Sequence, residues 1–190
     1  ALRHPTWSMG SKISVDSPTL ALKALEVIEA HFLYGLPYDR IEVVVHPQRI
    51  VHAFVEFADG SVLAQLGFPT MELPILYALT HPVRLPDTGV SRFDPVAAGS
   101  LTFEPVRADL FRTFDVGVAA GRAGGTAPAV FNAANEAAVA AFLDRRIPFG
   151  RIADTIHAVL DAHTVQPATA LAAVREADRW ARARALEEMS

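Results

Sequence analysis

Cysteine and long apolar runs are both missing from this sequence. None of the 190 residues is a cysteine, which excludes disulfides, thiolate nucleophiles and cysteine-ligated zinc and is compatible with a reducing cytoplasm, where we expect the protein. No stretch approaches the roughly 20 consecutive apolar residues of a membrane-spanning helix. The formal net charge of -4 gives no electrostatic reason to expect nucleic acid or a membrane surface as a partner.

The glycine fingerprint of a dinucleotide-binding fold is also missing. The glycine-rich stretch 117–125 does not follow the Gly-x-Gly-x-x-Gly order and does not stand between a strand and a helix, so we interpret it as the end of a helix. The chain starts without a methionine and has no signal-peptide pattern. We expect it to be cut from a longer protein.

The composition is that of a globular protein, with 51% hydrophobic and 20% charged residues. Its patterns predict an α+β fold, with a small, mostly antiparallel sheet and helices, then a linker and a C-terminal four-helix bundle. The predicted strands are 12–15, 40–46, 50–57 and 61–66. The predicted helices are 17–34, 71–79, 109–122, 128–145, 150–162 and 168–188. Proline and glycine punctuate 81–108, which we interpret as an irregular linker.

The predicted helix 17–34 carries the most informative polar pattern. Ser17 is a suitable N-cap and Pro18 suits the first helical position. At 100° per residue, one face is apolar and predicted to be buried; it consists of Ala21, Leu25, Ile28 and Phe32. Lys23 and Glu26 lie three residues apart on the opposite side.

Two interpretations of that polar face remain open. Lys23 and Glu26 are neighbours at helical spacing and could form a solvated ion pair. Alternatively, the helix N-terminus at Ser17 and the Lys23 ammonium could bind a phosphate while Glu26 holds a hard divalent cation. The second arrangement would form part of a sugar-phosphate site.

Several longer words support the second interpretation. They are His4-Pro5-Thr6-Trp7-Ser8-Met9-Gly10, Lys12-Ile13-Ser14-Val15-Asp16-Ser17, Lys23-Ala24-Leu25-Glu26, Glu42-Val43-Val44-Val45-His46-Pro47-Gln48, Asp59-Gly60-Ser61-Val62-Leu63-Ala64-Gln65-Leu66-Gly67 and Asn132-Ala133-Ala134-Asn135-Glu136. In this order they resemble the 1-deoxy-D-xylulose 5-phosphate reductoisomerase family. The resemblance extends over essentially the whole chain.

The resemblance implies part of an oxidoreductase of non-mevalonate isoprenoid biosynthesis. That family converts 1-deoxy-D-xylulose 5-phosphate to 2-C-methyl-D-erythritol 4-phosphate with NADPH and Mg²⁺ or Mn²⁺, as a homodimer. Residues 1–80 would be a partial catalytic domain that also dimerises, 81–108 a linker, and 109–190 the C-terminal helical domain. The NADPH-binding domain would be absent from this chain, so we expect the 190 residues alone neither to bind NADPH nor to turn over substrate.

The resemblance also assigns roles to single residues. Ser17 and Lys23 would bind the substrate phosphate, with His4 nearby, and Glu26 would be one of three carboxylate ligands to the metal. Trp7 and Met9 would lie on a loop that closes over the substrate. His52 would support the active site and Met71 would pack near the nicotinamide. From the residues alone, His52 is interpreted as structural, because it stands beside a turn between strands; the resemblance makes a role in the site an equal alternative.

Departures from the family pattern keep a second function open. Leu22 stands where the family has an asparagine, and a leucine cannot hydrogen-bond a phosphate. The other two metal carboxylates of the family belong to a motif upstream of this chain. The alternative is therefore a non-catalytic dimerisation or interaction module derived from the enzyme.

Overall fold

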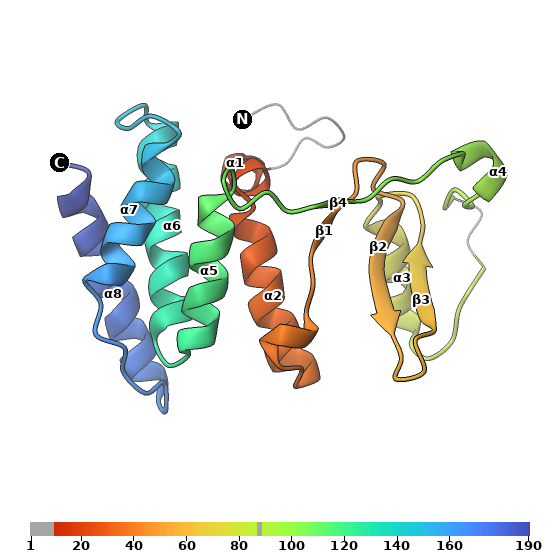
Figure 1. Ribbon diagram of the computed structural model, residues 1–190, viewed down its shortest axis with the longest axis horizontal. Coiled ribbons are helices and arrows are strands. Elements are labelled where there is room, and N and C mark those ends of the chain that lie inside the picture. Colours follow the sequence, from red (N-terminus) through yellow and green to blue (C-terminus); the bar gives the residue numbers. More distant parts are fainter. Residues whose placement is uncertain (1–9, 87–88) are drawn as a thin grey trace. The chain divides into compact units, whose positions relative to one another are not determined.

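The computed structural model describes residues 10–86 and 89–190. The chain divides into two compact units, one that combines the described residues up to Glu42 with Arg107–Ser190, and another formed by Val43–Val106. Figure 1 shows the elements of each unit. The predicted division into residues 1–80, 81–108 and 109–190 assigns a role to each segment and stays a prediction. The two compact units are defined by packing contacts and have different bounds.

The first unit begins with two helices where the sequence predicted a strand and one helix. Helix α1 spans Ser11–Thr19 and helix α2 spans Ala21–Tyr34, with Leu20 between them in the left-handed conformation (φ 56°, ψ 19°). The predicted strand 12–15 is wrong, because four residues that alternate between polar and apolar are too few to define a period. Ser17 is therefore inside α1 and is not the N-cap of a longer helix.

Helix α2 packs through small side chains. Its buried residues are Ala21, Ala24, Val27 and Ile28. Phe32, predicted to be buried, is 68% exposed, because the contact face follows Ala24 and Val27 rather than the outer end of the predicted stripe. The predicted end of the helix is confirmed, since Gly35 takes the left-handed conformation (φ 65°) directly after Tyr34.

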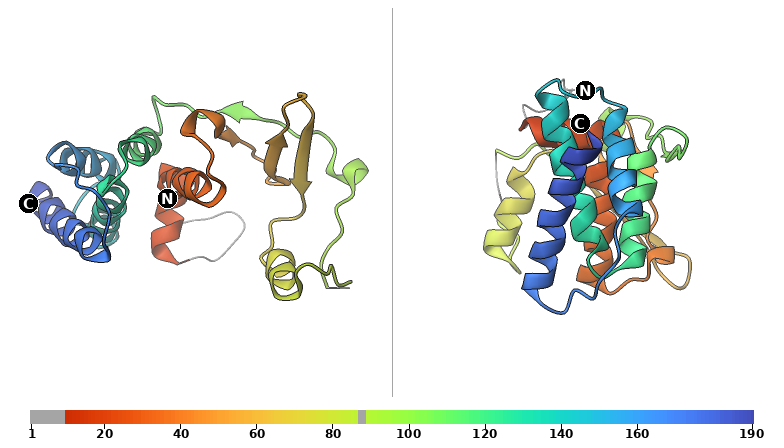
Figure 2. Two further views of the ribbon diagram at one scale, coloured as in Figure 1. Left: turned by 90° about the horizontal axis from the view of Figure 1, so that it is seen from below. Right: turned by 90° about the vertical axis from the view of Figure 1, so that its left-hand side faces the viewer.

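The remaining helices of this unit are α5 (Arg112–Ala123), α6 (Ala127–Leu143), α7 (Arg151–Asp161) and α8 (Leu171–Glu188). These bounds lie close to the four predicted helices. Helix α6 contacts α5, α7 and α8, and α5 also contacts α2; Figure 2 shows these helices running side by side. The core they enclose is rich in alanine, with Phe131, Ile152 and Ile156 as its largest buried apolar side chains.

The glycine-rich stretch is helical, as predicted. Gly117 and Gly121 lie in α5 and face neighbouring side chains so closely that a Cβ on Gly117 would stand 2.6 Å from the Ala24 Cβ. Gly124 ends the helix. Gly117 and Gly121 therefore allow the close packing of α5 against its neighbours.

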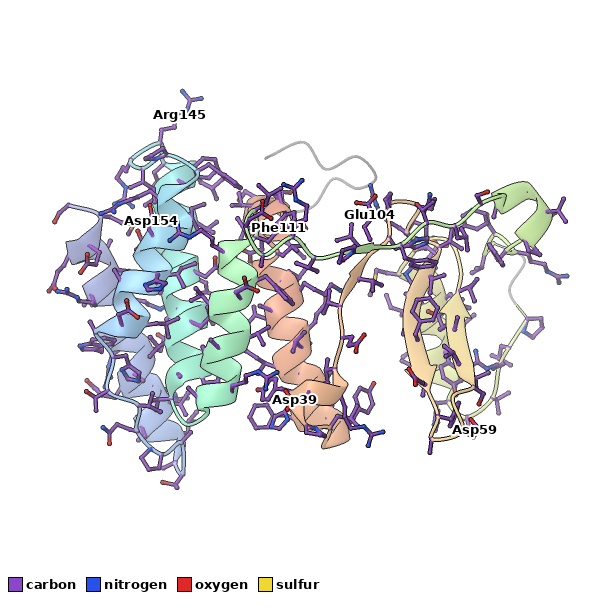
Figure 3. The ribbon with its side chains drawn as sticks, in the orientation of Figure 1. Asp39, Asp59, Glu104, Phe111, Arg145 and Asp154 are labelled. Atoms are coloured by element: carbon purple, nitrogen blue, oxygen red, sulfur yellow. The ribbon has the colours of Figure 1, made fainter. Side chains whose placement is uncertain are left out.

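Ion pairs join the surfaces of these helices. Arg122 contacts Asp39 at 2.6 Å and Arg112 contacts Asp154 at 2.8 Å. Figure 3 labels Asp39 in the segment after α2 and Asp154 on α7. Asp39 belongs to the short 3-10 helix η1 (Tyr38–Arg40), and burial raises the pKa of its neighbour Tyr38.

The second unit contains two small antiparallel sheets. Strand β1 (Val44–Val45) pairs with β4 (Glu104–Pro105), and β2 (Val51–Glu56) pairs with β3 (Val62–Leu66). Helix α3 spans Glu72–Thr80 and the short α4 spans Pro95–Ala98. The predicted hairpin and the helix after it are confirmed; the predicted strand 40–46 is wrong in length, since only two of its residues pair.

The α+β fold class is confirmed. The segment predicted as an irregular linker contains α4 and β4. Strand β4 forms there because it pairs with β1. Among the described residues, no helix is both long and apolar enough to cross a bilayer.

Candidate functional site

Ser17 lies in the last turns of α1, four residues before the start of α2. Its hydroxyl donates to the backbone carbonyl of Ile13 at 2.9 Å, the bond that a helical serine makes when no other acceptor is near. A phosphate at this position would therefore have to draw the Ser17 hydroxyl away from its own helix.

Lys23 and Glu26 form an ion pair on α2. Their side chains are 43% and 42% exposed, so both groups are accessible from solvent while their stems rest on the helix. The structure thus brings together the predicted phosphate-binding ammonium and the predicted metal-binding carboxylate. An exposed pair at this spacing contributes about 0.3–0.5 kcal/mol, which a stronger ligand for either group readily exceeds.

The carboxylate of Glu26 suits a hard cation such as Mg²⁺ or Mn²⁺, but one carboxylate does not make a site. Within residues 10–86 and 89–190, no three His, Asp or Glu side chains gather in a way that could hold a metal ion. Glu26 fits the role of a single ligand in a set completed from elsewhere.

His52 lies on β2 at an irregularity in the hairpin. Val51 pairs with Leu66 and Ala53 with Gln65, so His52 is the extra residue of a bulge. Its Nε2 lies 3.1 Å from the carbonyl oxygen of Gly67. Bulges redirect a side chain out of the regular alternation, and here the imidazole is held against the chain that leaves β3.

Met71 follows that chain. It occupies the N-terminal position before α3 and is 59% exposed. An exposed, unbranched apolar side chain of this kind can pack against a flat ring. His52 and Met71 both belong to the second unit, and Ser17, Lys23 and Glu26 belong to the first.

The remaining predicted site residues are His4, Trp7 and Met9. All three lie outside the described residues. Their predicted roles in substrate binding stay predictions.

A buried polar contact beside the site was not predicted. Asp16, next to Ser17, accepts a hydrogen bond from the Asn135 amide of α6 at 2.9 Å, across 119 residues of chain. Asn135 is the second asparagine of the run Asn132-Ala133-Ala134-Asn135-Glu136. No local pattern indicates which of the two asparagines turns inward.

His46 makes a second contact that was not predicted. Its Nδ1 lies 2.8 Å from the Thr102 carbonyl oxygen, and its ring stacks on Phe103 with centroids 4.6 Å apart. His46 therefore links the residue that follows β1 to the residues that precede β4, within the second unit.

Two family models match the sequence. The DXP reductoisomerase C-terminal domain matches residues 66–184, and the 1-deoxy-D-xylulose 5-phosphate reductoisomerase C-terminal domain matches residues 1–34. Curated relatives agree with this assignment. The chain is 51% identical to 1-deoxy-D-xylulose 5-phosphate reductoisomerase of Heliobacterium modesticaldum over 100% of this chain and 48% of the relative. It is 54% identical to the enzyme of Thermosynechococcus vestitus, over 96% of this chain and 45% of the relative.

Solved structures are similar over the same range. A DOX-P reductoisomerase in complex with NADPH, fosmidomycin and magnesium superposes with a TM-score of 0.92 at 40% identity, covering 100% of this chain and 48% of that one. The enzyme of Zymomonas mobilis in complex with NADPH gives 0.90 at 40% identity, over 94% and 47%. The chain spans about half the length of the relatives it matches, and it belongs to the DXP reductoisomerase C-terminal domain family.

Proposed function

We propose that this chain is a portion of an NADPH- and divalent-metal-dependent reductoisomerase. The reaction would convert 1-deoxy-D-xylulose 5-phosphate to 2-C-methyl-D-erythritol 4-phosphate, in the cytoplasm, as a step of isoprenoid biosynthesis. The observation that carries the proposal is the likeness over the whole chain to a reductoisomerase solved with NADPH, fosmidomycin and magnesium. The accessible pairing of Lys23 with Glu26 supports it.

Each part of the chain would hold one end of the substrate or cofactor. Ser17 and Lys23 would bind the phosphate, which anchors the substrate away from the reacting carbons and lets binding energy serve orientation. Glu26 would contribute one oxygen ligand to Mg²⁺ or Mn²⁺. Bound there, the cation would polarise the substrate carbonyl, and NADPH would supply the hydride. Met71 would pack near the nicotinamide.

His52 would act by holding the backbone that precedes Met71. Its bond to the Gly67 carbonyl fixes the chain where it leaves β3, five residues before α3 begins. His4, Trp7 and Met9 would approach the substrate from the segment before α1, with Trp7 and Met9 excluding water.

A homodimer through residues 40–66 is the second part of the proposal. A two-stranded hairpin is marginal alone in water, and this one exposes Val55 and Leu63 directly opposite each other. A second copy would cover such a surface.

Calorimetric titration of the 190-residue chain tests the phosphate site. With Mn²⁺ present, we expect Leu22→Asn to bind 1-deoxy-D-xylulose 5-phosphate about tenfold more tightly than the wild type, because a hydrogen bond to a charged group contributes about 1.5–3 kcal/mol. Lys23→Ala should abolish the binding heat. Binding that Lys23→Ala leaves unchanged would show that the phosphate sits elsewhere.

One observation favours the alternative of a non-catalytic module for the chain taken alone. Glu26 has no acidic neighbours able to complete a metal site within the described residues. The side chain of Leu22 has no group that can donate a hydrogen bond to a phosphate. If Leu22→Asn and the wild type both fail to bind substrate while the chain dimerises, the interaction module is the better assignment.

A further inference from the structure

Helix α1 satisfies nearly all of its polar side chains by itself. The hydroxyls of Ser14, Ser17 and Thr19 each donate to a carbonyl of the preceding turn. Lys12 reaches Asp16 on the same helix at 2.6 Å. Such bonds hold a helix together but do not tell it where to lie on its neighbours.

Asp16 is the exception. Its side chain is 2% exposed, and its two oxygens go separate ways: Oδ2 accepts from the Lys12 ammonium and Oδ1 from the Asn135 amide of α6. In the described part of the chain, this is the one side-chain hydrogen bond that ties α1 to α6.

The Asn135 side chain has no other hydrogen-bond partner among the described residues. It is fully buried, and its Oδ1 makes no hydrogen bond with any described residue. A buried amide oxygen left unpaired costs stability, so the pair is a poor device for strengthening the core. Buried polar contacts of this kind are best attested as devices that select one register or arrangement over others.

The apolar packing of α1 does little to set its register. Val15 is the one buried apolar residue of α1, beside the polar Ser14, Asp16 and Thr19. An apolar interface with little shape of its own loses uniqueness before it loses stability. A helix held by one buried apolar side chain can slide or turn with little change in buried apolar area.

We propose that Asn135, acting through Asp16, is a positioning residue that fixes the register of α1 on α6 and thereby the location of Ser17. Ser17 follows Asp16 directly, and the left-handed Leu20 connects α1 to the helix of Lys23 and Glu26. A slip of one residue would move α1 by about 1.5 Å along its axis with a rotation of about 100°. That is enough to displace the Ser17 hydroxyl from a phosphate held by Lys23.

The register can be measured without any ligand. Because the chain has no cysteine, the exposed residues Ser11 and Ala140 can be replaced by Cys and spin-labelled, and the α1–α6 distance read by pulsed electron resonance. We expect a narrow distribution in the wild type. Asn135→Ala should broaden or shift it.

Two further variants separate positioning from loss of stability. Val159→Ala opens a cavity at a fully buried position of α7; it should destabilise the chain yet leave the distance unchanged. Asp16→Leu combined with Asn135→Leu replaces both buried polar side chains by apolar ones with the same number of heavy atoms, which keeps the chain folded even if Asn135→Ala does not fold. It should broaden the distribution as Asn135→Ala does.

The exchange Asp16→Asn with Asn135→Asp restores a complementary pair and should recover the narrow distribution. Narrow distributions in both Asn135→Ala and the Asp16→Leu, Asn135→Leu double variant, or in the double variant alone should Asn135→Ala not fold, would overturn the inference.

A binding measurement then links the register to the site, and this arm rests on the proposed function. With Mn²⁺ present, Asn135→Ala should weaken affinity for 1-deoxy-D-xylulose 5-phosphate at least fivefold, and the exchange should restore it. If the wild type does not bind this substrate, the proposed function fails for the chain, while the distance measurement still decides the role of Asn135. Unchanged affinity in a variant with a broadened distribution would overturn the link to Ser17.

Discussion

His163 is the histidine whose charging the fold opposes. Its Nε2 lies 2.8 Å from the Thr126 hydroxyl and its ring lies 5.0 Å from that of Trp180; burial lowers the pKa of His163. The folded state therefore binds its proton less readily than the unfolded state. The resulting stability is complete above the unfolded pKa of about 6.5 and is lost as pH falls through the lower folded value.

We therefore expect the free energy of unfolding to fall between pH 7 and pH 5, and His163→Gln to flatten that slope. Urea unfolding at a series of pH values measures it. The exposed His81 provides the control, since His81→Gln should keep the wild-type slope. A steeper fall in His163→Gln would contradict the assignment.

How far single residues could be predicted depended on how local their partners are. The closeness of Lys23 and Glu26 follows from helical spacing and was predicted. The burial of Asp16 depends on an asparagine 119 residues away. The residues near Asp16 in the sequence do not indicate this partner. Ser17 was predicted as an N-cap, but the residues before it already form a helix. Ser17 therefore lies inside α1 and does not begin a helix.

At the scale of elements, α2 and α5 approach each other at Gly117. A Cβ at this position would stand 2.6 Å from both the Ala24 Cβ and the Phe131 Cζ. We expect Gly117→Ala to destabilise the chain by about 1–3 kcal/mol, because overpacking forces the backbones apart. Thermal or urea unfolding measures the loss.

Gly150→Ala is the matched control. Nothing lies within 4 Å of a Cβ built at Gly150, so this change should stay within about 0.5 kcal/mol of the wild type. Equal effects of the two substitutions would mean that the close contact of α2 with α5 does not limit the packing.

The helices from α5 to α8 and the β2–β3 hairpin were predictable because each has a sustained period and clear end signals. Strands β1 and β4 were not, since two-residue strands have no period of their own and depend on each other. Within the candidate site, α2 was predicted as a helix and its direction of packing was not. The buried face of α2 is set by the close approach of Gly117 and Gly121 on α5. Residues 17–34 by themselves carry no information about these glycines.

At the scale of the whole molecule, the two compact units have different interiors. The first encloses a continuous alanine-rich core between α1, α2 and the C-terminal helices. The second exposes apolar side chains along its hairpin, among them Phe54, Val55, Val62 and Leu63. A unit of this kind is expected to gain much of its stability from what covers it.

Dimerisation through the hairpin can be tested on the open face of the strands. Val55 and Leu63 are cross-strand partners, 55% and 64% exposed, so a carboxylate at either would be buried unpaired in a dimer. In sedimentation velocity we expect a wild-type dimer, and a dissociation constant at least tenfold higher for Leu63→Glu. Val96→Glu, at an apolar residue of α4 that is 88% exposed, should leave the dimer intact. A monomeric wild type, or a Leu63→Glu variant that still dimerises, would remove the hairpin from the interface and leave its apolar face to another partner.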